Sequence, residues 1–176
     1  TVKEIDTQTT EMNTTDYSDA LKSLNEAYTA LNNSVKQYEL VNNPAESYVI
    51  KCLEKVEHVT GISAVTEDND PNGHLGKAGG YTATVYFTCD WVNQANVIGD
   101  TIIDKGTDGG GAIEVYANVE DAESRNEYLE GFDGGVLASG SHIVVGTCVV
   151  RTSDKLAASK QKELEAAVIE ALTKLE

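Results

Sequence analysis

The chain has 176 residues, of which 40% are hydrophobic, and a formal net charge of −16. This length fits one domain with an accessory element, and the apolar fraction is sufficient for a core. A chain this acidic repels nucleic-acid phosphates and anionic lipids, so we expect no nucleic-acid partner. No run approaches the roughly 18 consecutive apolar residues that cross a bilayer. We therefore expect membrane attachment only through an anchor outside this sequence.

Residues 1–16 are rich in Thr, Glu, Asp and Asn, which predicts a flexible tether. Residues 17–42 are predicted to form one amphipathic helix, because apolar residues recur there at alternating spacings of three and four. We call these six residues the seam: Leu21, Leu24, Tyr28, Leu31, Val35 and Tyr38. The seam could pack on its own domain, form a stalk, or bind a second copy or another protein.

The remaining residues, 43–176, are predicted to form an α+β domain. Asn43 is expected to cap a helix that has Pro44 in its first turn and Gly61 at its end. A short strand over 62–66 follows this helix. Alternating apolar residues over 81–91 then predict a half-buried strand.

Residues 93–111 are Gly-rich and predicted to be irregular, with room for a short strand at 101–103. A strand over 112–117 leads to a helix capped by Asn118. The apolar run HIVVGTCVVR, residues 142–151, is predicted to be a central strand. A final helix is expected over 159–175.

The order of these elements predicts an α+β fold. Its sheet would be mixed and mostly antiparallel, with four or five strands, helices mainly on one face, and a long N-terminal helix before it. A ferredoxin-like sandwich is one version of this arrangement. Residues 112–151 are expected to form a right-handed parallel crossover.

The loop TEDNDPNGHLGK is a candidate calcium site. Asp68, Asp70 and Asn72 alternate and Gly73 follows, as in the first half of an EF-hand loop. Gly79 stands where the bidentate Glu should be, so Ca²⁺ would need further ligands. The alternative is a hairpin loop in which these residues serve turn geometry. We expect no other cofactor.

The cysteines, Cys52, Cys89 and Cys148, match no zinc-binding or redox spacing. Cys89 and Cys148 each fall in a predicted strand, so both a disulfide between them and buried free thiols are consistent with the sequence. We find no nucleophile motif and no metal-binding histidine pair, and we assign no catalytic residue. The alternative is an unrecognised enzyme in a cleft between the Gly- and Asp-rich loops.

Several aromatic residues fall in or beside predicted strands. Such side chains can stack on sugars or peptides, although packing within the strands is the more common role. The residues are Tyr81, Tyr86, Trp91 and Tyr116.

Four runs of residues carry a resemblance to a known family: GISAVTEDNDPNG, GGYTATVYFT, GDTIIDKGTDGGGAIEVY and SGSHIVVGTCVVRTSD. They resemble a domain near the C-terminus of surface-exposed lipoproteins and membrane-anchored proteins of gut Firmicutes and bifidobacteria. The resemblance covers residues 43–175 and implies an extracellular, cell-surface-anchored location, but it assigns no functional residue. We therefore expect a non-catalytic extracellular domain of a Gram-positive cell-envelope protein, with a binding or structural role. The alternatives are a calcium-stabilised surface module and an unrecognised enzyme.

Overall fold

The computed structural model describes residues 2–5, 16–135 and 140–175. The chain divides into two compact units, residues 1–36 and 37–176. Most of the predicted tether, residues 1–16, lies outside the described residues, and residues 2–5 form a helical turn.

Helix α2 is a single unbroken helix over Ser18–Leu40, as predicted. It buries no residue, and one ion pair, Lys22 with Glu26 at 4.0 Å, lies along its surface. The six seam side chains are between 49% and 65% exposed. The apolar stripe of α2 is therefore formed along one side of the helix, and no residue of the helix is buried.

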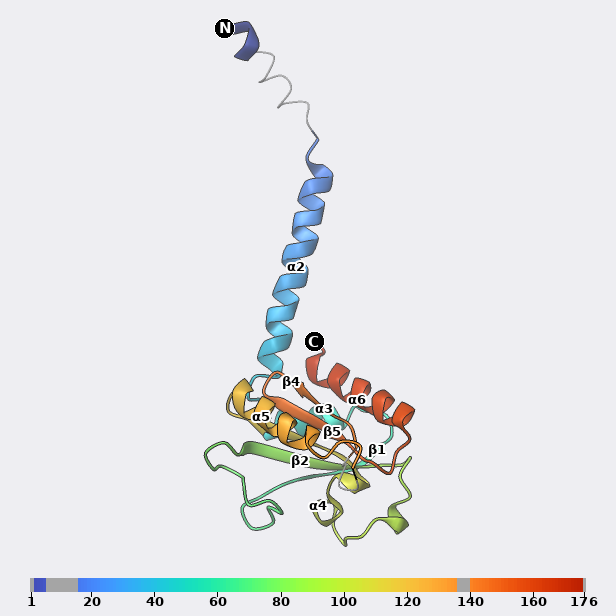
Figure 1. The fold of residues 1–176 in the computed structure, drawn as a ribbon. Helices are drawn as coiled ribbons and strands as arrows, with labels where there is room; N and C mark the ends of the chain where they lie inside the picture. Colours follow the sequence, from blue (N-terminus) through green and yellow to red (C-terminus); the bar gives the residue numbers. More distant parts are fainter. Residues whose placement is uncertain (1, 6–15, 136–139, 176) are drawn as a thin grey trace. The chain divides into compact units, whose positions relative to one another are not determined.

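The second unit contains a five-stranded sheet in the order β1-β2-β3-β5-β4 (Figure 1). Every hydrogen-bonded pair of strands is antiparallel. These findings confirm the predicted α+β class, the mainly antiparallel sheet and the long N-terminal helix. Along the chain from β1 onward, the strands and the two long helices that follow them are in the order β-β-β-α-β-β-α, whereas a ferredoxin-like sandwich has β-α-β-β-α-β. The strands are β1 Val59–Ala64, β2 Tyr81–Cys89, β3 Gly110–Tyr116, β4 His142–Val145 and β5 Cys148–Thr152.

The predicted central strand over 142–151 is in fact a hairpin. Strands β4 and β5 pair with Val145 opposite Cys148, so Gly146 and Thr147 form a two-residue turn. Gly146 has a φ of 61°, as expected of the first central residue of a type II′ turn. Strand β4 runs parallel to β3, but β5 lies between them. Because α5 connects β3 to β4, the predicted parallel crossover is present, although its second strand is β4 alone and β5 lies between the two.

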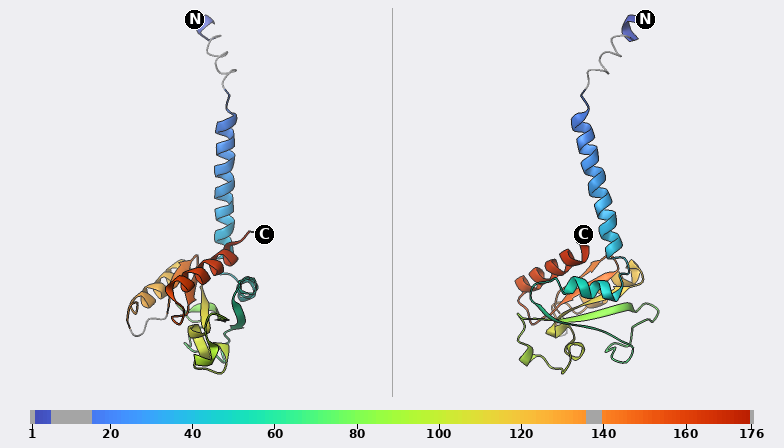
Figure 2. Two further views of the ribbon diagram at one scale, coloured as in Figure 1. Left: turned by 90° about the vertical axis from the view of Figure 1, so that its right-hand side faces the viewer. Right: turned by 180° about the vertical axis from the view of Figure 1, so that it is seen from behind.

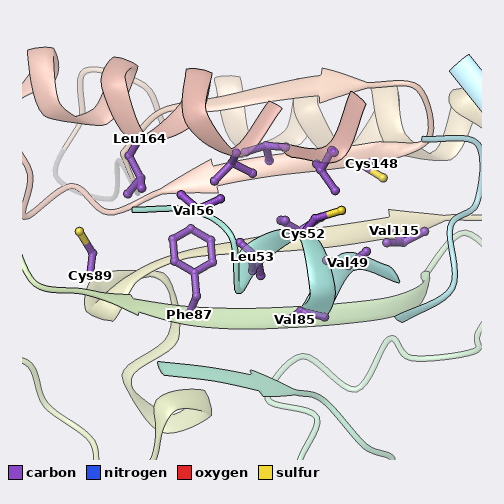
Figure 3. Close-up of a cluster of buried hydrophobic side chains, with 14 of the residues drawn as sticks. Val49, Cys52, Leu53, Val56, Val85, Phe87, Cys89, Val115, Cys148 and Leu164 are labelled. Carbon is purple, nitrogen blue, oxygen red and sulfur yellow. The ribbon is translucent and has the colours of Figure 1, made fainter. Parts of the chain in front are cut away.

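The main core lies between one face of the sheet and two helices, α3 (Glu46–Leu53) and α6 (Ala158–Thr173). Figure 2 shows these two helices side by side. Figure 3 shows Val49 and Leu53 of α3 and Leu164 of α6 meeting Val85 and Phe87 of β2. This is the face that the apolar alternation of β2 predicted.

The second face of the sheet is also covered. Helix α5 (Val119–Glu130) packs over β3, β4 and β5, and the short α4 (Ile102–Lys105) covers β1 and β2. Two smaller apolar clusters lie beneath them. Strand β2 is consequently buried on both faces. A bulge between Tyr81 and Ala83 places Tyr81 in the second-face cluster, apart from the apolar residues that alternate along the rest of the strand.

Two local predictions were wrong and one was confirmed. Asn43 has a φ of 49° and does not cap α3, whose N-cap is Ala45. The Asn43 N–H instead donates to Oγ1 of Thr147 at 2.6 Å. The predicted strand at 101–103 is the start of α4, which Thr101 caps. Asn118 caps α5 as predicted, since its Oδ1 accepts from the backbone N–H of Asp121 at 2.8 Å.

No disulfide joins Cys89 and Cys148, and both residues are buried free thiols, which is one of the two alternatives that the sequence left open. Cys89 ends β2 and Cys148 begins β5, with β3 between these strands. Figure 3 shows the two side chains on opposite sides of the core. Thr88 pairs with Gly110 and Cys148 with Val115, so the two cysteines lie near opposite ends of β3 and cannot be bridged without movement of the backbone.

Candidate binding cleft

A cleft crosses the second face of the sheet. It consists of two adjoining hollows of about 400 Å³ and about 500 Å³. Three residues line both hollows: Asn72 of the loop before β2, and Arg125 and Tyr128 of α5. Buried strand residues, Tyr81 and Tyr116 in the smaller hollow and Tyr86 and Arg151 in the larger, form its floor.

An ion network centred on Glu114 lies beneath the cleft. Glu114 is completely buried in the middle of β3. Arg125 donates to both of its carboxylate oxygens, from Nε to Oε2 at 2.8 Å and from Nη2 to Oε1 at 3.0 Å. Arg151 donates from Nη1 to Oε1 at 2.8 Å, and the Tyr116 hydroxyl donates to Oε2 at 2.9 Å. Four hydrogen bonds thus satisfy one buried carboxylate.

The two guanidinium groups keep this carboxylate charged. Burial alone would raise the pKa of Glu114, but the hydrogen bonds and positive charges of Arg125 and Arg151 outweigh it and lower that pKa. Burial and the Glu114 charge in turn raise the pKa of Tyr116, so its hydroxyl stays a proton donor. One carboxylate and two guanidinium groups leave the network with a formal charge of +1.

Local structure brings the members of this network together. Arg125 lies in the middle of α5, whose start is fixed by the Asn118 cap. In the β3–β5 register Arg151 pairs with Ala112, so it is the diagonal neighbour of Glu114. Arg125 and Arg151 are the only arginines in the sequence, and both converge on Glu114.

Sequence reasoning missed this network, although a signal was present. Glu114 and Arg151 interrupt the apolar strands AIEVY and CVVRT. Charged residues are rarely buried without a partner of opposite charge. One acidic and one basic residue inside apolar strands therefore indicated a buried ion pair, although not the contribution of Arg125 from a helix.

The loop before β2 closes one side of the cleft, and Asp70 organises it. The Asp70 carboxylate accepts from the backbone N–H of Asn72 at 3.0 Å and of Leu75 at 2.8 Å, and also from the Tyr81 hydroxyl. Burial opposes ionisation, but these hydrogen bonds lower the pKa of Asp70 to about 2.

The calcium candidates therefore have different surroundings. Asp70 is engaged by the loop and Tyr81, while Asp68 and Asn72 are exposed. Across the described residues, no group of three or more His, Cys, Asp or Glu side chains is placed to hold a metal ion. The geometry of Asp70 matches the hairpin-loop alternative, and calcium binding at Asp68, Asp70 and Asn72 stays a prediction.

The α5 side of the cleft presents an exposed aromatic ring. The side chain of Tyr128 is 59% exposed, and the Arg125 guanidinium lies 5.4 Å from its ring centroid. Phe132 meets the same ring edge-on, with centroids 5.0 Å apart. The Tyr128 ring is therefore supported by two contacts: Arg125, which Glu114 holds in place, and Phe132.

The aromatic residues singled out in the sequence are mostly packed. Tyr81, Tyr86 and Tyr116 are buried, which is the more common role considered for them. Trp91 lies against the core, with His58 at 4.0 Å and the Lys160 ammonium at 3.8 Å from its ring centroid. The exposed ring of the cleft belongs to Tyr128, which sequence reasoning did not select.

Among the described residues of the cleft, two candidate catalytic side chains can be compared. Ser124 and His74 both line the smaller hollow, but no hydrogen bond joins them in the part of the chain that the structure describes. The hydroxyls of Tyr81 and Tyr116 already donate to carboxylates. The other polar groups of the cleft are amide, imidazole, hydroxyl and guanidinium groups and the carboxylates of Asp104 and Asp121, all of which can form hydrogen bonds with a ligand.

Comparisons with models of protein families, with curated proteins and with solved structures find no match to this chain. In the part of the chain that the structure describes, no helix has both the length and the apolarity to cross a membrane.

Proposed function

We propose that this chain is a non-catalytic extracellular domain of a Gram-positive cell-envelope protein, and that the cleft binds a neutral, hydroxyl-rich ligand such as a carbohydrate. The exposed Tyr128 ring, held against Arg125 on the cleft wall, is the observation that carries the proposal. Concave sites with an aromatic surface and a few convergent polar groups are the usual form of small-ligand sites.

The charges of the cleft favour a neutral ligand. Asp121 lines the smaller hollow and Asp104 the larger, in a chain with a net charge of −16, so an anionic ligand is repelled. A cationic ligand would meet the positive network of Glu114, Arg125 and Arg151. A neutral ligand with several hydroxyls avoids both penalties.

The polar groups of the cleft match the chemistry of hydroxyls. Nε and Nη2 of Arg125 bind Glu114, which leaves Nη1 as a donor. Asn72 and Ser124 add amide and hydroxyl groups that can both donate and accept. The apolar faces of a sugar ring can stack on Tyr128 while its hydroxyls bind these groups. Preorganisation of Arg125 by Glu114 lowers the entropy lost on binding.

The proposal is tested by binding the full chain to an array of immobilised glycans. We expect a subset of glycans to bind, and Tyr128→Ala to weaken that binding about tenfold, since it removes the stacking surface. Tyr128→Phe keeps the ring and should retain most of the binding. Tyr17→Ala removes a similarly exposed tyrosine outside the cleft and should leave binding unchanged. Binding that Tyr128→Ala does not alter would contradict the proposal.

The proposed location rests on the resemblance of residues 43–175 to surface-exposed lipoproteins, and it suits the acidity of the chain. It is tested separately on intact cells of the source organism with antibodies against the folded domain. Labelling of intact cells, removed by brief external proteolysis, is the expected result. Labelling that appears only after the cells are permeabilised would contradict an extracellular location.

A further inference from the structure

From the exposed seam of α2, we propose that the chain forms a homodimer through an antiparallel pairing of this helix with the same helix of a second copy. All six seam residues are exposed, and α2 buries no residue. Helices in water gain most of their stability from packing an apolar face. Covering the seam would therefore stabilise α2 itself.

The spacing of the seam residues allows the seam to pair with an antiparallel copy of itself. Its six residues are separated by three, four, three, four and three positions, and this series is the same in both directions. In an antiparallel pair each a position meets a d position of the partner helix. Every apolar residue then meets another in the second copy: Leu21 meets Tyr38, Leu24 meets Val35, and Tyr28 meets Leu31.

This arrangement combines side chains of different size. Each tyrosine lies opposite a leucine, so large and smaller side chains alternate across the interface. In a parallel pair each residue would meet its own copy, and Tyr28 and Tyr38 would each face an identical ring and hydroxyl. Because two bulky rings in one layer of a helix pair pack less well than a ring against a leucine, the antiparallel pairing is favoured.

The charges along α2 also favour a second copy. Most residues that flank the seam are neutral and short, namely Asn25, Ala27, Asn32 and Ser34, and the exception is Glu39 beside Tyr38. Over Ser18–Leu40 the helix carries three acidic and two basic residues, whereas the whole chain has a net charge of −16. Two copies of α2 can therefore approach with little repulsion between the helices, although the chains as a whole repel each other.

The test is sedimentation equilibrium of the full chain over a wide range of concentrations. We expect a monomer–dimer equilibrium that strengthens as salt is added, because salt screens repulsion between the acidic chains and leaves the apolar interface intact. Leu24→Glu should weaken the dimer at least about a hundredfold, since it places two charges in the interface. Asn33→Glu adds the same charge on the opposite side of the helix and should change dimerisation little. A chain that stays monomeric at all concentrations would overturn the proposal.

The direction of pairing is tested by cross-linking in mild oxidant. The double variant Leu24→Cys/Val35→Cys should form covalent dimers, because these positions meet in an antiparallel pair. Leu24→Cys alone should not, because residue 24 of one helix is distant from residue 24 of the other. Efficient cross-linking of the single variant would overturn the antiparallel arrangement.

Discussion

Arg125 of α5 binds Glu114 of β3 side-on, with hydrogen bonds of 2.8 Å from Nε and 3.0 Å from Nη2. This contact joins a helix to the centre of the sheet and sets the position of the cleft wall. Arg151 binds the same carboxylate from the neighbouring strand β5, at 2.8 Å. The network is thus both a structural link across the second face and the support of the proposed site.

Removing the Glu114 charge should destabilise the fold strongly. Glu114→Gln leaves two guanidinium groups without their counter-charge, one of them almost fully buried. Breaking a buried ion pair by removing one partner costs about 3–5 kcal/mol, and we expect the lower end because Arg125 is partly exposed. Equilibrium unfolding in urea measures the change.

The matched control for this variant is Glu123→Gln, an exposed position on α5. It makes the same chemical change without a buried partner and should alter stability by less than about 0.5 kcal/mol. Equal losses in the two variants would mean that the Glu114 network adds nothing specific to stability.

The hydrogen bonds of Asp70 should make stability depend on pH in acid. Its pKa is about 2 in the folded protein and 3.8 in the unfolded chain. Because the folded pKa is the lower one, the contribution of Asp70 is fully present above about pH 4 and is lost as the pH falls towards 2. Tyr81→Phe removes one donor and should raise the pKa of Asp70, as NMR titration of its carboxyl group would show. Titration of Asp70 at its ordinary pKa in the unaltered protein would contradict the described loop geometry.

The hairpin turn between β4 and β5 should not tolerate a side chain. Gly146 has a φ of 61°, and an added Cβ would collide with the backbone carbonyl of Val41. Gly146→Ala should therefore cost at least about 2 kcal/mol. Gly76→Ala places a side chain at a similar positive φ, 68°, where nothing lies within 4 Å of the new Cβ. It should cost only about 1 kcal/mol, and a Gly146→Ala loss no larger than this would count against the turn.

The thiols of Cys89 and Cys148 should be shielded in the native protein. Burial raises the pKa of Cys89, and burial raises the pKa of Cys148 to about 12, so neither forms a reactive thiolate at neutral pH. Alkylation without reductant should label both residues in denaturant and neither in the folded protein. Mass spectrometry of the peptides gives the result. A disulfide-linked pair of peptides containing these two residues would show that the strands are arranged differently.

Much of the fold was predictable because local patterns decide it. The seam predicted α2, Asn118 marked the start of α5, and apolar alternation located β2. The turn at Gly146 and Thr147 was not predicted, because β-branched and apolar residues continue on both sides of it. The bulge at Tyr81 was missed because it depends on pairing with β3, which one strand's sequence does not specify.

The candidate site was less predictable because its parts come from distant segments. Glu114, Arg125 and Arg151 meet only once α5 folds over β3 and β5. Asp70 was selected from the sequence for its spacing, but its contacts are with the loop backbone and Tyr81. Exposure of Tyr128 depends on how α5 packs. Composition and spacing therefore predicted the scaffold better than the cleft.

The most direct test of the proposed function is an NMR titration of the ¹⁵N-labelled full chain with a soluble saccharide that binds in the glycan array. The account predicts amide shifts concentrated at the cleft, in Asn72, Tyr81 and the α5 segment around Arg125 and Tyr128, and their loss in Tyr128→Ala. Shifts that map instead to the α3–α6 face, or that persist unchanged in Tyr128→Ala, would contradict it.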